Sequence, residues 1–175
     1  MTPKERRDRL FKKGKPLARK LVILNGEGYS KDVGILWAAY KAGSFEFPEG
    51  MTQEDFVAAV SGLIDQYGQA WIMDDVNISF SDKRGQVCIV FATIVGLLVE
   101  ARFGFFRWAT KRNILRVTAS FLNMIKNSSK TGICIVRTDK DRRNLCDHLK
   151  QYDLLYYIGR SAENEYLYSI RGRGS

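Results

Sequence analysis

Three cationic residues surround the predicted start of a helix in the stretch FFRWATKRNIL, residues 105–115. Thr110 is a typical helix-capping residue, and Arg107, Lys111 and Arg112 lie within a few positions of it. Unpaired amides give a helix N-terminus a partial positive charge, so neighbouring cations cost a few tenths of a kcal/mol to about 1 kcal/mol. The pattern therefore indicates that this place attracts a negatively charged group. The residues expected to contact that group are Arg107, Thr110, Lys111, Arg112 and Arg116.

The chain distributes its charge unevenly. The net charge is +9, and residues 1–20 hold nine basic and two acidic residues. Residues 21–100 hold four basic and eleven acidic residues, whereas residues 101–138 hold eight basic residues and no acidic one. The positive charge is thus concentrated at the N-terminus and in the segment that contains the opening stretch. Both are candidate anion-binding surfaces.

Residues 1–20 are expected to form a basic N-terminal arm outside a single domain of residues 21–175. The arm contains Pro3, Gly14 and Pro16 and few apolar residues, which is typical of a segment that is mobile or laid over a partner. Its deletion is then expected to leave folding intact. Its cations suit a DNA phosphate backbone or an acidic protein surface, and a solvated tail that aids solubility is the alternative. The candidate contact residues are Arg6, Arg7, Arg9, Lys12, Lys13, Lys15, Arg19 and Lys20.

Cysteine and histidine usage argues against structural disulfides and against a metal site. The three cysteines are odd in number and far apart, and His148 is the one histidine available to join them. Alternation along a strand would place Asp74 and Asp75 on opposite faces. These carboxylates, together with Asp82, are therefore not expected to share a metal ion.

The longest apolar run, residues 87–99, has 13 residues, whereas about 20 are needed to cross a bilayer. Its β-branched content indicates a buried strand and no membrane span. The basic N-terminus lacks the apolar run of a secretory signal, so we expect synthesis in a cytoplasm.

The periodicity predicts an α+β fold. Helices are expected to begin at Ser30, Thr52 and Thr110, each a capping residue before an amphipathic stretch. An antiparallel pair of strands is expected around the turn at residues 81–85. Residues 86–106 are too long for one strand, so a break is expected at Gly96.

The last third of the chain is expected to add a strand at residues 132–138, a helix at 139–155 and a strand at 165–172. In the helix after Thr110, one face is expected to be buried, namely Ile114, Val117, Phe121, Leu122 and Ile125. The opposite face is expected to lie in solvent, namely Arg112, Arg116, Ser120, Asn123 and Asn127.

This order of elements resembles the Gcn5-related N-acetyltransferase (GNAT) fold over roughly residues 30–171. The resemblance is carried by the passage from LLVEARFGFF into the helix after Thr110, followed by GICIVRT and RRNLCDHLKQY. It implies a mixed, largely antiparallel sheet flanked by about four helices. More narrowly, FFRWATKRNIL and the following FLNMI are similar to small GNAT-like proteins encoded by tailed bacteriophages.

In the GNAT family, an R/Q-x-x-G-x-G/A loop at this position presents backbone amides to the pyrophosphate of acetyl-CoA. Arg107 matches the first position of that loop, but Thr110 stands in place of the first glycine and Arg112 in place of the second small residue. We therefore expect acetyl-CoA to bind weakly or not at all, so that no cofactor is expected.

Catalytic GNAT proteins commonly use a carboxylate on the preceding strand as base and a tyrosine on the last helix as acid. The resemblance makes Glu100 the candidate base, with a surface pair between Glu100 and Arg102 as the alternative. Cys146 and His148 are the candidate acids on the last helix, where the tyrosine is missing.

Three sources of the anion near Lys111 stay open at this point. It can be the pyrophosphate of a cofactor, a phosphate or carboxylate of a partner, or a carboxylate of the chain itself, from Glu100, Asp74 or Asp75. The altered loop favours a partner.

The sequence therefore predicts a catalytically degenerate GNAT-like bacteriophage structural or internal virion protein. Its expected partners are other virion proteins and, through the basic arm, packaged DNA. Its expected location is the virion, after synthesis in the host cytoplasm. An active acetyl-CoA-dependent N-acetyltransferase is the alternative function, and the oligomeric state stays open.

Overall fold

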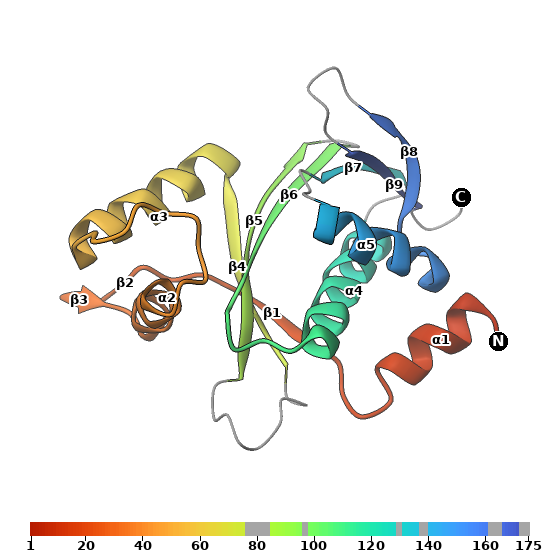
Figure 1. Cartoon of the computed structure of the whole chain (residues 1–175), viewed down its shortest axis with the longest axis horizontal. Helices are drawn as coiled ribbons and strands as arrows, with labels where there is room; N and C mark the ends of the chain where they lie inside the picture. Colours follow the sequence, from red (N-terminus) through yellow and green to blue (C-terminus); the bar gives the residue numbers. More distant parts are fainter. Residues whose placement is uncertain (76–84, 96–97, 129–130, 137–139, 161–165, 172–175) are drawn as a thin grey trace.

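A seven-stranded sheet runs through the centre of the molecule, seen nearly edge-on in Figure 1. The computed structural model describes residues 1–75, 85–95, 98–128, 131–136, 140–160 and 166–171. Neighbouring strands are antiparallel except for β6 and β7, which are parallel. In spatial order the strands are β1 (Leu17–Lys20), β4 (Gln69–Asp74), β5 (Gln86–Val95), β6 (Leu98–Phe105), β7 (Thr131–Val136), β9 (Tyr166–Arg171) and β8 (Tyr156–Arg160). A separate hairpin joins β2 (Leu24–Asn25) to β3 (Gly28–Tyr29).

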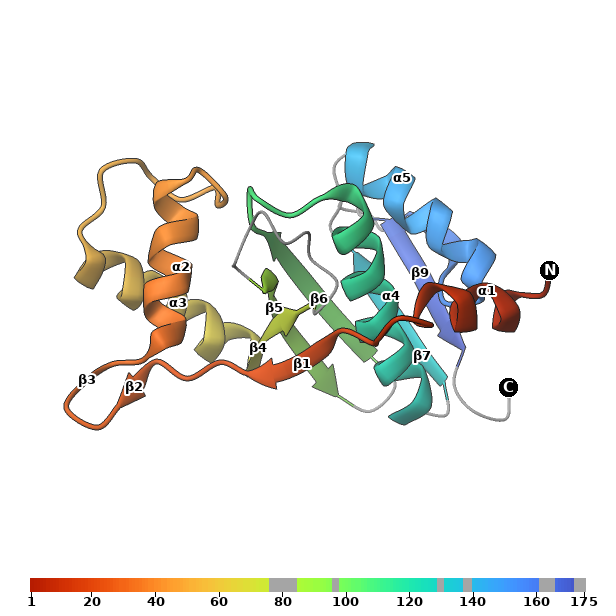
Figure 2. The same cartoon turned by 90° about the horizontal axis from the view of Figure 1, so that it is seen from below.

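Helices cover both faces of this sheet (Figures 1 and 2). Two helices, α2 (Lys31–Lys41) and α3 (Gln53–Tyr67), lie on one face. The other face carries α4 (Lys111–Ser128) and α5 (Lys140–Leu149), which continues into a 3₁₀ turn at Lys150–Tyr152. The N-terminal helix, α1 (Pro3–Leu10), lies beside that 3₁₀ turn. The expected α+β fold is confirmed, with one helix more than the four expected.

The three expected helix starts are confirmed by their capping bonds. The hydroxyl oxygens of Ser30, Thr52 and Thr110 accept hydrogen bonds from the third amide of α2, α3 and α4, at 3.4, 3.2 and 3.2 Å. Each bond satisfies one of the amides that a helix N-terminus leaves without an intrahelical partner. Local sequence thus determines where these helices begin.

The described residues of the apolar run 87–99 lie in strands, as expected. Its residues from Val87 to Ala92 are buried in β5 and divide between two hydrophobic cores, one under α2 and α3 and the other under α4 and α5. β5 ends at Val95 and β6 begins at Leu98, while the expected break at Gly96 lies outside the described residues, as do residues 81–84 of the expected turn. No helix in the described part of the chain is long and apolar enough to cross a membrane.

The sheet separates between its two parallel strands. Among the described residues, only Leu98–Glu100 of β6 pair with β7, at Ile133–Ile135, and β6 runs on to Phe105 beyond the end of β7. The chain then turns directly into α4. This separation is what leaves room for a cleft between the start of α4 and α5.

Residues 1–20 pack against the rest of the chain, where the sequence predicted a separate N-terminal arm. β1 pairs with β4 along its whole length. α1 is attached to the 3₁₀ turn after α5, because Arg7 donates to the carbonyl of Tyr152 at 2.6 Å. Between them, Ser120 donates to the carbonyl of Pro16 at 3.0 Å. The sequence did signal α1, since Thr2 and Glu5 form a capping box before a proline-initiated helix. Other elements that the sequence analysis did not predict are β1, β2, β3 and β8.

The expectation that one face of α4 lies in solvent is wrong at the centre of that face, because residues 10–16 cover it. Arg116 is 1% exposed, and its Nε lies 2.9 Å from Oδ2 of the equally buried Asp75. The same guanidinium donates to the carbonyls of Leu10 and Gly14. Arg116 and Ser120 are therefore buried polar residues whose partners come from distant segments of the chain.

Replacing Asp75 by Asn should destabilise the protein strongly. It keeps the shape of the side chain but leaves the Arg116 guanidinium buried without a compensating charge, a change that costs about 3–5 kcal/mol. The control is Asp74→Asn, one residue earlier at the end of β4, which removes one of the two carboxylate partners of the partly exposed Arg19 and should cost about 0–1 kcal/mol. Urea denaturation of both variants measures the difference, and equal losses would contradict this account of the buried pair.

Candidate anion-binding site

A cleft of about 870 Å³ lies between the start of α4 and α5. α4 supplies Lys111, Arg112, Ile114 and Leu115, α5 supplies Asn144, Leu145 and His148, and Phe105 at the end of β6 completes the lining. Half of these residues are apolar, and two of the others are the cations of the opening stretch. Its size is within the range of small-molecule binding pockets, about 300–1,000 Å³.

The start of α4 is held in place by contacts with β5. The amide of Phe106 donates to the carbonyl of Val87 at 2.9 Å, and the indole of Trp108 donates to the carbonyl of Gln86 at 2.8 Å. The amide of Ala109 closes a turn onto the carbonyl of Phe106. These bonds fix the position from which Lys111 and Arg112 project.

Lys111 and Arg112 are both exposed, and neither forms an ion pair with any residue that the structure describes. They occupy the first two positions of α4, where helix geometry provides no acceptor for the backbone amides. The third amide, that of Asn113, is already bound by the hydroxyl of Thr110. Two side-chain cations and two amides therefore remain for an anion.

The carboxylates that could have neutralised this helix end are engaged elsewhere. Asp75 binds Arg116 and also accepts from the side chain of Asn113 at 3.2 Å. Asp74 points to the other face of β4, where it binds Arg19 at 2.8 Å. The opposite orientations of these two aspartates are confirmed, while Asp82 lies outside the described residues. Among the described residues, Asp75 thus neutralises Arg116, and no carboxylate forms an ion pair with Lys111 or Arg112.

Two of the expected anion contacts are not at the cleft. Arg116 is taken by Asp75, so it is not available to a ligand. The backbone of Arg107 donates to the hydroxyl of Ser44 at 2.8 Å, and its guanidinium lies close to Gly43, just after α2. A cation near a helix C-terminus is favourable, which explains this position. The structure therefore brings Lys111 and Arg112 together and places Arg107 elsewhere.

The candidate catalytic residues do not converge. Glu100 pairs with Thr93, whose hydroxyl donates to the carbonyl of Tyr67 at the end of α3, so both lie on the α3 face of the sheet. Cys146 is buried and lines a smaller pocket beside Tyr156 and Tyr168 of the last two strands. Only His148 lines the α4–α5 cleft, where it is exposed and hydrogen-bonded to Gln151.

Several cationic side chains of residues 1–20 contact other residues of the protein. Arg6 donates to the side chain of Gln151, and Arg19 bridges Asp32 and Asp74. Although partial burial opposes its charge, the hydrogen bonds to these two carboxylates raise the pKa of Arg19. Lys15 lies over the ring of Phe11, 5.7 Å from its centre. Exposed side chains at this end include Arg9, Lys12, Lys13 and Lys20.

The sequence analysis missed the second wall of the cleft. Asn144 and Leu145 reach it from α5, about thirty residues away along the chain from Lys111. Nothing in the local pattern of either helix indicates that they face each other. The two helices face each other because β6 separates from β7. That separation is a property of strand pairing.

Comparison with solved structures identifies the fold. A GNAT-family acetyltransferase from Bacillus anthracis aligns with a TM-score of 0.57 and 13% identity, over 90% of this chain and 95% of that one. A phosphinothricin acetyltransferase from Sinorhizobium meliloti, solved with acetyl-CoA, aligns with a TM-score of 0.53 and 12% identity, over 92% and 91%. A domain from Methanocaldococcus jannaschii gives 0.52 and 15%, over 89% and 97%. No protein-family model and no curated protein matches the chain. The protein therefore has a GNAT-like fold.

The residues at the start of α4 do not fit the pyrophosphate of acetyl-CoA in the way that a glycine-rich loop does. The hydroxyl of Thr110 occupies the amide of Asn113, which a glycine at this position would leave free. Arg112 places a long side chain on the rim of the cleft, where the family has a small residue. The cleft therefore offers an anion side-chain cations more than a backbone cradle.

Replacing Thr110 by Ala should destabilise the protein by about 1 kcal/mol, because the amide of Asn113 loses its acceptor. Thr110→Ser keeps the hydroxyl and should cost much less. Urea denaturation of the two variants measures the difference. If Thr110→Ala were as stable as Thr110→Ser, the hydroxyl would not be the cap of α4.

Proposed function

We propose that the protein is a GNAT-like binding protein without acetyltransferase activity, and that its α4–α5 cleft receives an anionic group of a partner. One observation carries this proposal. Lys111 and Arg112 stand at the N-terminus of α4, on the rim of a partly apolar cleft, without a carboxylate among the described residues to neutralise them.

The physical preference of this place is for a phosphate or a carboxylate. Two like charges at a helix N-terminus repel the partial charge of the helix as well as each other, and a bound anion relieves both effects. Arginine can hold either group through two parallel hydrogen bonds. The apolar lining favours a partner that also buries hydrocarbon surface.

Acetyl transfer is disfavoured by the arrangement of its candidate residues. The candidate base Glu100 lies on the α3 face, whereas Cys146 faces the last two strands. A general base must come within hydrogen-bond reach of the proton that it removes. The substituted loop positions Thr110 and Arg112 argue in the same direction.

The identity of the partner rests on the resemblance to phage proteins. We propose other virion proteins as partners of the protein. Packaged DNA is proposed as a partner of the exposed cations Arg9, Lys12, Lys13 and Lys20. Within a virion, the protein would then act by contact and not by catalysis.

An acetyl-CoA-dependent N-acetyltransferase is the second candidate. One observation favours it: His148, a candidate acid on α5, lines the same cleft as Lys111 and Arg112. In that case the two cations would meet the cofactor's pyrophosphate. Affinity for acetyl-CoA separates the two functions.

Replacing Lys111 and Arg112 together by Ala should weaken anion binding and leave the free energy of unfolding unchanged or raised by up to about 1 kcal/mol, because repulsion at the helix end is removed. Calorimetric titration with inorganic pyrophosphate, beside urea denaturation, measures both effects. The control is Lys31→Ala, an exposed lysine in the first turn of α2.

Acetyl-CoA is the second titrant. The unmodified protein should show weak binding or none at physiological salt. A saturable micromolar site for acetyl-CoA would overturn the proposed function and support the acetyltransferase. A double variant that loses stability but keeps full pyrophosphate binding would show that the cations are structural.

Replacing Arg9, Lys12 and Lys20 by Ala should weaken non-specific DNA binding with little change in stability, since all three side chains are exposed. If each neutralises one phosphate, the slope of log affinity against log salt should fall by about 2–3. Fluorescence anisotropy at several salt concentrations measures the slope. An unchanged slope would remove DNA from the proposed partners.

A further inference from the structure

The β2–β3 hairpin is the most exposed apolar feature at the α2–α3 end of the molecule. Leu24 and Tyr29 face each other across it and are 66% and 44% exposed. Gly26 and Glu27 form the turn between the strands, and Gly26 has a positive φ of 67°. Each strand has two residues and pairs with no strand of the main sheet.

This hairpin lacks a covering element within the described part of the chain. A two-stranded hairpin is marginally stable on its own, and exposed apolar side chains commonly mark contact surfaces. The tip also presents one carboxylate, that of Glu27, which is exposed. The hairpin thus offers two apolar side chains on either side of a single negative charge.

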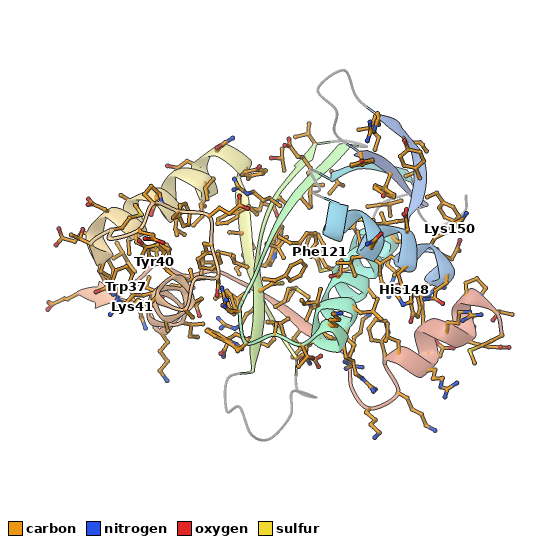
Figure 3. All side chains as sticks on the ribbon, in the orientation of Figure 1. Trp37, Tyr40, Lys41, Phe121, His148 and Lys150 are labelled. Carbon is orange, nitrogen blue, oxygen red and sulfur yellow. The ribbon has the colours of Figure 1, made fainter. Side chains whose placement is uncertain are left out.

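The α4–α5 cleft has the complementary composition. Ile114, Leu115 and Leu145 provide apolar surface, and Lys111 and Arg112 provide the positive charge at its rim. The hairpin and the cleft cannot meet within one molecule, because they lie at opposite ends of it. Figure 2 shows β2 and β3 at one end and α5 at the other, and Figure 3 shows Trp37, Tyr40 and Lys41 of α2 far from His148.

We propose that the hairpin of one copy of this protein docks in the α4–α5 cleft of a second copy. Glu27 accepts hydrogen bonds from Lys111 and Arg112, while Leu24 and Tyr29 contact the apolar lining. This inference rests on the proposed function, because it names the partner that supplies the anionic group.

The distribution of charge along the chain supports association between opposite ends of two copies. Among residues 21–68, six exposed carboxylates stand against two exposed lysines, whereas residues 1–16 carry seven basic and two acidic residues. Potentials of opposite sign at the two ends steer copies into a head-to-tail encounter. Such a heterologous contact uses different surfaces on the two copies and generates rings or open chains.

Complementation of two variants tests the head-to-tail contact. Glu27→Lys reverses the hairpin charge but keeps its cleft, and Lys111→Ala/Arg112→Ala loses the cleft charge but keeps its hairpin. Sedimentation velocity should show concentration-dependent association of the unmodified protein and at least about tenfold weaker association of each variant alone. An equimolar mixture of the two variants should form a dimer that does not grow further, because each copy retains one working surface.

Salt and a matched control define the charge contribution. Association should weaken as ionic strength rises, since the contact is only partly shielded from solvent. Glu49→Lys, which reverses an exposed charge in the loop between α2 and α3, should associate like the unmodified protein. Leu24→Ser/Tyr29→Ser tests the apolar part and should also weaken association.

The outcomes separate this inference from the proposed function. If the protein stays monomeric at all concentrations, or if the variant mixture does not dimerise while the unmodified protein associates, the inference is wrong. Pyrophosphate binding that depends on Lys111 and Arg112 would still support an anion site with another partner. If pyrophosphate does not bind and Glu27→Lys does not change association, both the inference and the proposed function are wrong.

Discussion

The buried ion pair between Asp75 and Arg116 connects the three parts of the chain on which the candidate site depends. Asp75 follows β4, Arg116 lies in α4, and the same guanidinium binds carbonyls of Leu10 and Gly14 in the N-terminal segment. Taking two charges out of water is costly, and only a full set of partners offsets that cost. The N-terminal segment and the first half of α4 therefore form one structural unit.

This pair also determines the charge of the cleft. Asp75 is used by Arg116 and by Asn113, which lies in the first turn of α4. Lys111 and Arg112 are consequently left with their charge exposed beside apolar side chains. A helix end that carries cations and lies next to apolar side chains favours a ligand with both an anionic group and an apolar surface. The β2–β3 hairpin has both.

The GNAT-like fold positions this cleft but does not by itself supply a reaction. A fold hosts many functions, and the chemistry depends on which side chains meet. Here Glu100, Cys146 and His148 face three different places. The separation of β6 from β7 leaves room for the cleft, and the function proposed for the residues around it is contact with a partner.

The sequence by itself determined the helix starts at Ser30, Thr52 and Thr110, the strands of the apolar run and the opposite orientations of Asp74 and Asp75. These features follow from capping bonds, alternation and periodicity, which act over a few residues. Only the tertiary structure decided that Arg116 is buried, that residues 1–20 belong to the domain and that α5 forms the second wall of the cleft. An arginine on the polar face of a helix looks solvent-exposed until a distant carboxylate and a covering segment meet it, and such contacts between segments far apart leave no periodic signal in either segment.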